Sequence, residues 1–142
     1  MRSNKKVEKF LELLDIFKKL RGKNGCAWDK KQTNKTLIKY LFEESEEFKQ
    51  AVRKNDIENM KEELGDVLLQ VIFHAQIAKE NKWFDIYDVI DGLNKKLIRR
   101  HPHVFGKSKA KTPEEITIQW NKIKEKEKKS KSNRLSTKND KI

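Results

Sequence analysis

Two short acidic clusters are the residues of this sequence best suited to chemistry. Glu43, Glu44 and Glu47 belong to the run EESEE at 43–47. Glu63 and Asp66 belong to the run EELGD at 62–66. Residues three or four apart share one face of a helix, so each helical run would place carboxylates side by side. Carboxylates grouped in this way are ligands for hard divalent cations.

The apolar pattern around both clusters predicts that some of these acids face the interior. Glu44 stands where a leucine is expected in one helical stripe, and Glu63 and Asp66 flank another; the stripes are Leu37, Leu41, Glu44, Phe48 and Ala51, and Met60, Leu64, Val67 and Val71. We therefore expect four carboxylates, those of Glu44, Glu47, Glu63 and Asp66, to converge between two helices. Burying unpaired charge costs about several kcal/mol per group, so the cluster implies a bound cation or shifted protonation.

The oxygen-only ligand set points to Mg²⁺, with Mn²⁺ as a substitute, because no Cys or His spacing typical of zinc accompanies it. The plainer alternative is a solvated acidic helix face, which is the better interpretation of Glu46 and Glu62. It does not account for Glu44 and Glu63. Glu43 is also followed four residues later by Glu47 rather than by a base, a repulsive spacing on a helix.

Helical periodicity accounts for most of the chain and predicts an all-α fold. We expect a bundle of about five helices, over about 5–21, 34–54, 57–81, 86–100 and from 113 onward, completed by oligomerisation. Thr33 or Asn34, Asp56, Asp85 and Thr112 are the expected N-caps. The stretch 67–78 is apolar nearly all round, which predicts a helix covered on every side. Gly65, in the same predicted helix over 57–81, predicts close approach of a neighbouring helix or a ligand.

Composition limits the remaining possibilities. The chain has 142 residues, 39% charged and 35% hydrophobic, with a net charge of +12 and one cysteine, Cys26. No apolar run reaches membrane-spanning length, so we expect a cytoplasmic protein without membrane contact. Residues 1–129 form the expected module, and residues 130–142 a basic, disordered tail. The tail's expected role is solubility, with nucleic acid contacted only nonspecifically.

Basic and aromatic residues follow the acidic clusters. Lys96, Arg99 and Arg100 end the helix predicted at 86–100, and arginine donates bidentate hydrogen bonds to phosphate. Trp120 and Lys124 lie one helical turn apart and could stack on a base and contact a phosphate. The ordinary alternatives are helix-dipole compensation and a hydrophobic anchor. His74 is expected to be a hydrogen-bonded core histidine, and His101 and His103 are expected to be turn residues.

Taken in order, the motifs resemble a known family. The runs GCAWDKKQT, EESEE, EELGDVLLQVIFHA, KLIRRHPHVFG and WNKIK are similar to a single module of the MazG nucleoside triphosphate pyrophosphohydrolases, of the all-α NTP pyrophosphatase superfamily. The likeness covers residues 8–128. The superfamily pattern EExxE…ExxD falls on Glu43, Glu44, Glu47, Glu63 and Asp66. Ala27 stands where the family usually has proline.

The resemblance implies Mg²⁺-dependent hydrolysis of nucleoside triphosphates, canonical or damaged, to the monophosphate and pyrophosphate, in nucleotide-pool house-cleaning. It implies metal ligands at Glu44, Glu47, Glu63 and Asp66, and a water-orienting or catalytic acid at Glu43. It places nucleotide contacts at Lys96, Arg99, Arg100, Trp120 and Lys124. It also implies a homodimer or higher homo-oligomer.

Two alternatives to this function stay open. One is another enzyme of the superfamily, a dUTP pyrophosphatase or a phosphoribosyl-ATP pyrophosphohydrolase. The other is a catalytically weak helical interaction module with an RNA-binding tail. The GCAWD and RRHPHVF runs favour MazG over the first. Acids in a helical core weigh against the second, since a binding module gains nothing from them.

Overall fold

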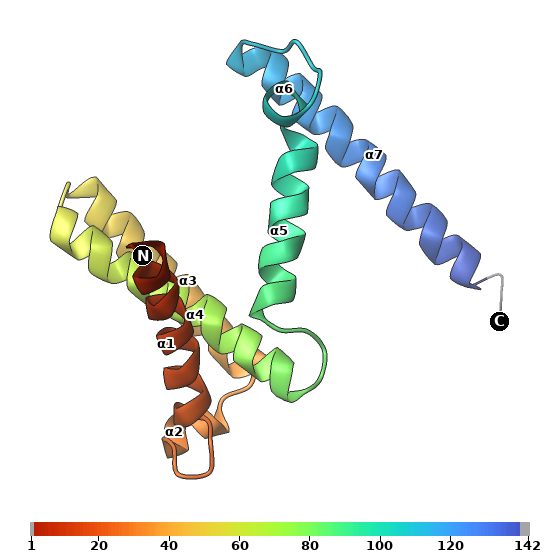
Figure 1. Ribbon diagram of the computed structural model, residues 1–142. Coiled ribbons are helices and arrows are strands. Elements are labelled where there is room, and N and C mark those ends of the chain that lie inside the picture. Colours follow the sequence, from red (N-terminus) through yellow and green to blue (C-terminus); the bar gives the residue numbers. More distant parts are fainter. Residues whose placement is uncertain (1, 140–142) are drawn as a thin grey trace. The chain divides into compact units, whose positions relative to one another are not determined.

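The computed structural model describes residues 2–139, and every regular element in that range is a helix, which confirms the all-α prediction (Figure 1). The helices are α1 (Arg2–Leu20), α2 (Ala27–Lys31), α3 (Asn34–Arg53), α4 (Ile57–Glu80), α5 (Ile86–Arg100), α6 (Pro102–Phe105) and α7 (Pro113–Asn139). The chain forms two compact units, the first ending at Val89 and the second beginning at Ile90. No helix in the described range is long and apolar enough to cross a membrane.

The first unit is built on the antiparallel pair α3 and α4, with α1 packed against α4 (Figure 1). Its core contains one buried cluster drawn from α1, α3, α4 and the start of α5, namely Phe17, Leu37, Ile72, Phe73, Ala75, Ile77 and Ile86. The rings of Phe17 and Phe73 meet edge to face with centroids 5.4 Å apart. This small core fixes α3 and α4 relative to each other, and these two helices carry the acidic clusters.

Side-chain caps set the helix starts close to where the sequence predicts them. The hydroxyl of Thr33 accepts a hydrogen bond from the backbone N–H of Thr36, whose own hydroxyl accepts from the Thr33 N–H. The carboxylate of Asp56 accepts from the N–H of Asn59 at the start of α4. Equivalent caps occupy the two later starts predicted at Asp85 and Thr112. Each cap accepts a hydrogen bond from a backbone N–H group in the first turn, which has no carbonyl partner within the helix.

Arg21 ties the connection between α1 and α3 to the end of α4. Its Nε donates to Glu80 at 2.8 Å, and Nη1 donates to the carbonyl oxygens of Gln32, at 3.2 Å, and Asp29. Its guanidinium also lies over the ring of Phe73, 5.6 Å from the centroid. The side chain is only 8% exposed. One buried cation therefore holds the loop, the short helix α2 and the start of α3 in register with α4.

The chain reversal after α1 requires glycine at position 25. A Cβ built on Gly25 would lie 2.1 Å from the carbonyl oxygen of Leu20, which is far inside contact distance. The approach is close because the N–H of Cys26 donates to that same oxygen at 2.8 Å. The sequence predicts the end of the helix here, but not the short helix α2 that follows the turn.

The sequence predicts that residues 67–78 are covered on every side, and this chain alone does not cover them. One face of α4 is buried through Ile72 and Phe73, but Leu68 and Val71 are 45% and 40% exposed, and Leu64, before this stretch, is 54% exposed. The expected close approach at Gly65 is also absent among the described residues, because nothing lies within 4 Å of an added Cβ. An apolar pattern predicts that a face will be covered but does not identify what covers it.

The second unit contains most of α5, together with α6 and α7. The short helix α6 was not predicted, because the sequence suggests a simple turn at His101-Pro102. Here the ring of His101 meets Trp120 edge on, with centroids 5.2 Å apart, and His103 Nδ1 contacts the side-chain amide of Gln119 at 3.0 Å. Both histidines thus pack against α7.

The helix α7 corrects the prediction of a disordered tail from residue 130. It continues to Asn139, and only residues 140–142 of that predicted tail lie outside the described range. Lysine, glutamate and arginine are good helix formers, so a polar segment can remain helical without contributing to a core. The lack of apolar residues after position 130 shows that this segment does not join a core, but it does not exclude a helix.

Two glycine substitutions test this description of the first unit. Gly25→Ala should lower the free energy of unfolding by about 1–3 kcal/mol, because its methyl group clashes with backbone atoms that cannot move away. Gly65→Ala should raise it by about 0.5–1 kcal/mol, because alanine favours the helix and meets open space. Urea unfolding followed by circular dichroism measures both. Marked destabilisation by Gly65→Ala would show that another surface approaches α4 there.

Candidate functional site

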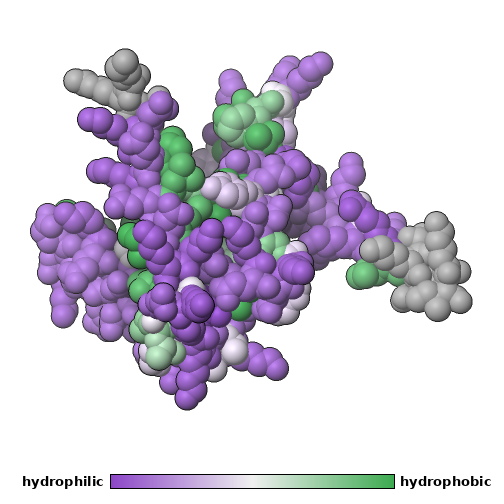
Figure 2. All heavy atoms as spheres, turned by 60° about the horizontal axis from the view of Figure 1, so that its bottom comes forward, coloured by the Kyte–Doolittle hydropathy of each residue, from purple (hydrophilic) through white to green (hydrophobic). Residues whose placement is uncertain are grey.

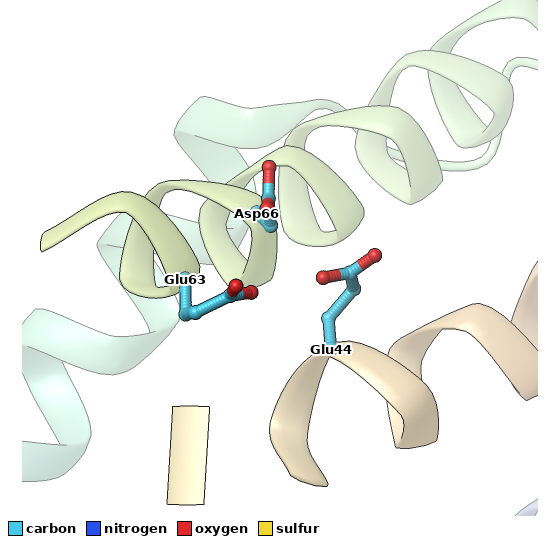
Figure 3. Close-up of side chains that lie close together, drawn as sticks. All are labelled: Glu44, Glu63 and Asp66. Carbon is cyan, nitrogen blue, oxygen red and sulfur yellow. The ribbon is translucent and has the colours of Figure 1, made fainter. Parts of the chain in front are cut away.

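Three carboxylates from two helices meet in the first unit. Glu44 projects from α3 and Glu63 and Asp66 from α4, each toward the space between the helices (Figure 3). One carboxylate oxygen from each residue lies within 4.8 Å of the others, and all three side chains are partly buried. The hairpin geometry explains the meeting, because Glu63 and Asp66 are one turn apart on the helix that faces Glu44.

The remaining two acids of the predicted set lie at the edge of this cluster. Glu43 and Glu47 are exposed, and they are not among the three residues whose oxygens come together. Burial raises the pKa of Glu44, and the negative charges of Glu47, Asp66 and Glu43 raise it further. Glu47 is therefore an immediate electrostatic neighbour of the cluster, whereas Glu43 is a more distant one.

The strongest sign of mutual repulsion is at Glu63. Burial, hydrogen bonding with Glu47 and the charges of Glu47, Asp66 and Glu44 together raise the pKa of Glu63 from 4.5 to about 7. A carboxyl group with a raised pKa resists ionisation because its charge is neither solvated nor compensated. The cluster is thus short of positive charge near neutral pH.

The donor set fits a hard divalent cation. Glu44 Oε2 and Glu63 Oε2 are buried and have no hydrogen-bond partner. Among the described residues, no ion pair joins Glu44, Glu63 or Asp66 to a lysine or arginine. Buried acceptors without donors are rare in folded proteins, and an oxygen-liganded cation would satisfy them. The residues present therefore suit Mg²⁺ or Mn²⁺.

His74 takes the structural role that the sequence predicts. Its Nδ1 contacts the side-chain amide nitrogen of Asn34 at 2.8 Å, and burial lowers the pKa of the ring. The contact joins the start of α3 to α4, two helical turns beyond Asp66. Asn34, considered in the sequence only as a cap, thus helps to hold the two acid-bearing helices together.

The predicted nucleotide-binding residues lie in the second unit, and most of them are close together. Lys96, Arg99 and Arg100 line a hollow of about 660 Å³, together with Pro102, Ile123, Lys126, Glu127, Ser130, Lys131 and Arg134. Trp120 lies beneath Arg100, whose guanidinium carbon is 5.1 Å from the ring centroid. Lys124 is exposed and is not among the residues lining this hollow.

Sequence reasoning missed the acid that organises these bases. Glu127 Oε1 accepts from Arg99 Nε at 2.6 Å, and Oε2 accepts from Arg100 Nη2 at 2.9 Å. Hydrogen bonds from Arg100 and Arg99 lower the pKa of Glu127 to about 2. The available signal was its spacing, because Glu127 follows Trp120 by two helical turns within a run rich in lysine.

Comparison with known proteins identifies the family. Residues 32–105 match the MazG nucleotide pyrophosphohydrolase domain. Over 127 residues the chain is 55% identical to the nucleoside triphosphate pyrophosphohydrolase/pyrophosphatase MazG of Thermotoga maritima, covering 89% of this chain and 48% of that protein. It is 43% identical over 121 residues to the nucleoside triphosphate pyrophosphohydrolase of Escherichia coli K12, covering 84% of this chain and 46% of that protein.

A solved structure supports the same conclusion. The crystal structure of a mazG-related protein from Thermotoga maritima matches with a TM-score of 0.67 and 32% identity, covering 83% of this chain and 98% of that one. The chain therefore belongs to the MazG nucleotide pyrophosphohydrolase family. It spans about half the length of the two curated relatives described above. The match at residues 32–105 contains both acidic clusters and the bases of α5.

Repulsion within the acidic cluster should make the stability of the fold depend on pH. Because the pKa of Glu63 is raised from 4.5 to about 7, its contribution to stability is fully present below pH 4.5 and is lost as the pH rises through about 7. In a chelating buffer, Glu63→Gln should therefore melt at a higher temperature than the parent at pH 8, and the difference should shrink toward pH 5.

Glu62→Gln is the matched control, because Glu62 is exposed on the neighbouring position of α4. The melting temperature of Glu62→Gln should equal that of the parent at every pH. Thermal melts in EDTA, with and without excess Mg²⁺, measure both effects. A Glu63→Gln variant that lost stability at pH 8, or gained as much from Mg²⁺ as the parent, would contradict a repulsive metal-binding cluster.

Proposed function

We propose that this chain hydrolyses nucleoside triphosphates to the nucleoside monophosphate and pyrophosphate with a bound divalent cation. The observation that carries the proposal is the group of three convergent carboxylates in a MazG family chain, two of which, Glu44 and Glu63, have a buried oxygen without a hydrogen-bond partner. Glu44, Glu63 and Asp66 would hold Mg²⁺, with Mn²⁺ as a substitute, and Glu47 would complete the set at the edge. The relatives' names support this activity but belong to longer proteins.

The charges explain why substrate and cation should bind together. A nucleoside triphosphate carries about four negative charges, which would otherwise be repelled by the acidic cluster. The bound cation would supply Lewis-acid polarisation of the reacting phosphoryl group. Glu43, exposed beside the cluster, would orient the attacking water or accept its proton.

The basic residues of the second unit would hold the nucleotide. Lys96, Arg99 and Arg100 offer ammonium and guanidinium donors to the phosphates, and Trp120 offers a ring for stacking. Lys124 is proposed from the resemblance alone. Canonical and damaged nucleotides are both candidate substrates, and we place the reaction in house-cleaning of the cytoplasmic nucleotide pool.

A second copy of the chain is the proposed cover for the exposed apolar face of α4. Leu64 and Leu68 are exposed on α4, and Leu93 and Leu97 are 49% and 40% exposed on α5. Figure 2 shows apolar side chains at the surface among polar ones. Exposed apolar side chains of this number favour association. We therefore propose a homodimer as the minimal assembly.

The activity is tested by the products formed from a panel of NTPs and dNTPs with Mg²⁺, separated by chromatography. The parent should release the monophosphate and pyrophosphate, and Glu63→Gln should lose several orders of magnitude in rate because no other group restores the lost ligand. Glu62→Gln should retain parental activity. Release of diphosphate and phosphate, or near-parental turnover by Glu63→Gln, would overturn the assignment. Exclusive turnover of dUTP or phosphoribosyl-ATP would favour a sister enzyme.

The assembly is tested by light scattering at micromolar concentration. We expect the mass of a dimer or a larger oligomer, and Leu68→Lys should shift the population toward monomer because it places a charge on the apolar face of α4. A parent protein that is monomeric and fully active would rule out the dimer. Exposed Glu62, changed to Lys, serves as a control for added charge on the same helix.

A further inference from the structure

One carboxylate bridges two consecutive arginines in the second unit. Glu127 accepts a hydrogen bond from Arg99 Nε through Oε1 at 2.6 Å and another from Arg100 Nη2 through Oε2 at 2.9 Å. Consecutive residues of a helix point about 100° apart, so the two guanidinium groups would not meet without a common partner. Glu127, on α7, is that partner. Its side chain is 19% exposed, so the bridge is largely shielded from water.

The two arginines are held to different degrees. Arg100 is 17% exposed, and its guanidinium lies over Trp120, whose ring also packs against His101. Arg99 is 50% exposed. Both line the same hollow, as does Glu127. Arg100 is therefore anchored by a carboxylate and a ring, whereas the Arg99 side chain depends on Glu127 for its position.

The bridge leaves donors for a ligand. The contact of Arg99 uses Nε, so the fork formed by its two Nη groups is not part of the bridge. That fork matches two oxygens of a phosphate group. Lys96, Lys126 and Lys131 line the same hollow, so one carboxylate does not neutralise it. Glu127 thus orients positive charge without removing it.

We propose that Glu127 is a positioning residue, which holds Arg99 and Arg100 in the orientation that binds the phosphates of the substrate. The proposal rests on the function proposed above and extends it to a residue outside the acidic clusters and the predicted nucleotide-binding set. Arginine side chains lose rotamer freedom when they bind a ligand, and a side chain that is already fixed loses less. The bridge would therefore strengthen phosphate binding without taking part in the reaction.

The opposite interpretation is that Glu127 competes with substrate for the arginines. Its burial and its two short hydrogen bonds argue against this, because displacing the carboxylate would break charge-assisted bonds and leave its charge without a partner. The two interpretations predict opposite changes in substrate affinity when Glu127 is replaced. Removing a positioning carboxylate weakens substrate binding, whereas removing a competitor strengthens it.

The test is steady-state hydrolysis of the best nucleoside triphosphate by Glu127→Gln, with saturating Mg²⁺. The amide keeps the size of the side chain but lacks the charge that binds both guanidinium groups. We expect KM to rise about tenfold with kcat within about twofold, because two arginines must be ordered on binding. Glu127→Asp, which keeps the charge on a shorter stem, should lie between the parent and Glu127→Gln.

Glu125→Gln is the matched control, because Glu125 is exposed two residues earlier on α7 and should leave KM unchanged. A fall in KM for Glu127→Gln, or an unchanged KM, would overturn the proposal. If Glu127→Gln does not fold, Glu127→Asp decides the question by the same KM criterion.

Direct binding separates this inference from the proposed hydrolysis. Calorimetric titration of parent and Glu127→Gln with pyrophosphate and Mg²⁺ requires no turnover. Weaker binding by the variant supports the positioning role even if the parent hydrolyses none of the panel, in which case only the proposed activity fails. Equal binding by the two proteins overturns the positioning role even if the parent is an active hydrolase.

Discussion

The convergence of carboxylates between α3 and α4 is the main constraint on the structure, because the rest of the fold must offset their repulsion. Like charges in a partly buried space repel each other, and burial together with this repulsion raises the pKa of Glu44 and of Glu63. Without a cation, the packing of the two helices must offset this cost. The core cluster around Leu37 and Phe73 provides apolar burial about two to three turns away, so that the same helix pair can carry both the core and the charged site.

Several features of the first unit serve to keep this helix pair in register. Thr33 and Asp56 fix where α3 and α4 begin, and Asn34 joins α3 to His74 on α4. Arg21 then fastens the preceding loop to Glu80 at the far end of α4. These contacts lie away from the acids, so the acidic cluster does not have to supply the stability of the fold that presents it. Such separation suits a site whose charges are costly without a ligand.

The sequence predicted the parts of this molecule that depend on local chemistry. Helix starts followed from capping residues such as Thr33 and Asp56, and the meeting of Glu44 with Glu63 and Asp66 followed from helical spacing. Features that depend on long-range contacts were missed. The bridge from Glu127 to Arg99 joins residues 28 positions apart, and the spacing of Glu127 from Trp120 does not show that its carboxylate reaches arginines on another helix. Likewise, the apolar residues of α4 predict that the helix packs against other surfaces. They do not show that the chain itself leaves part of one face exposed.

Glu63 and Glu127 show how the same side chain serves opposite purposes in the two units. Burial and the neighbouring acids raise the pKa of Glu63 to about 7, whereas hydrogen bonds from two arginines lower the pKa of Glu127 to about 2. A carboxylate already satisfied by bases has little remaining affinity for a cation, and one surrounded by acids has much. The acids of α3 and α4 are therefore suited to bind an external cation, while Glu127 is suited to organise internal ones.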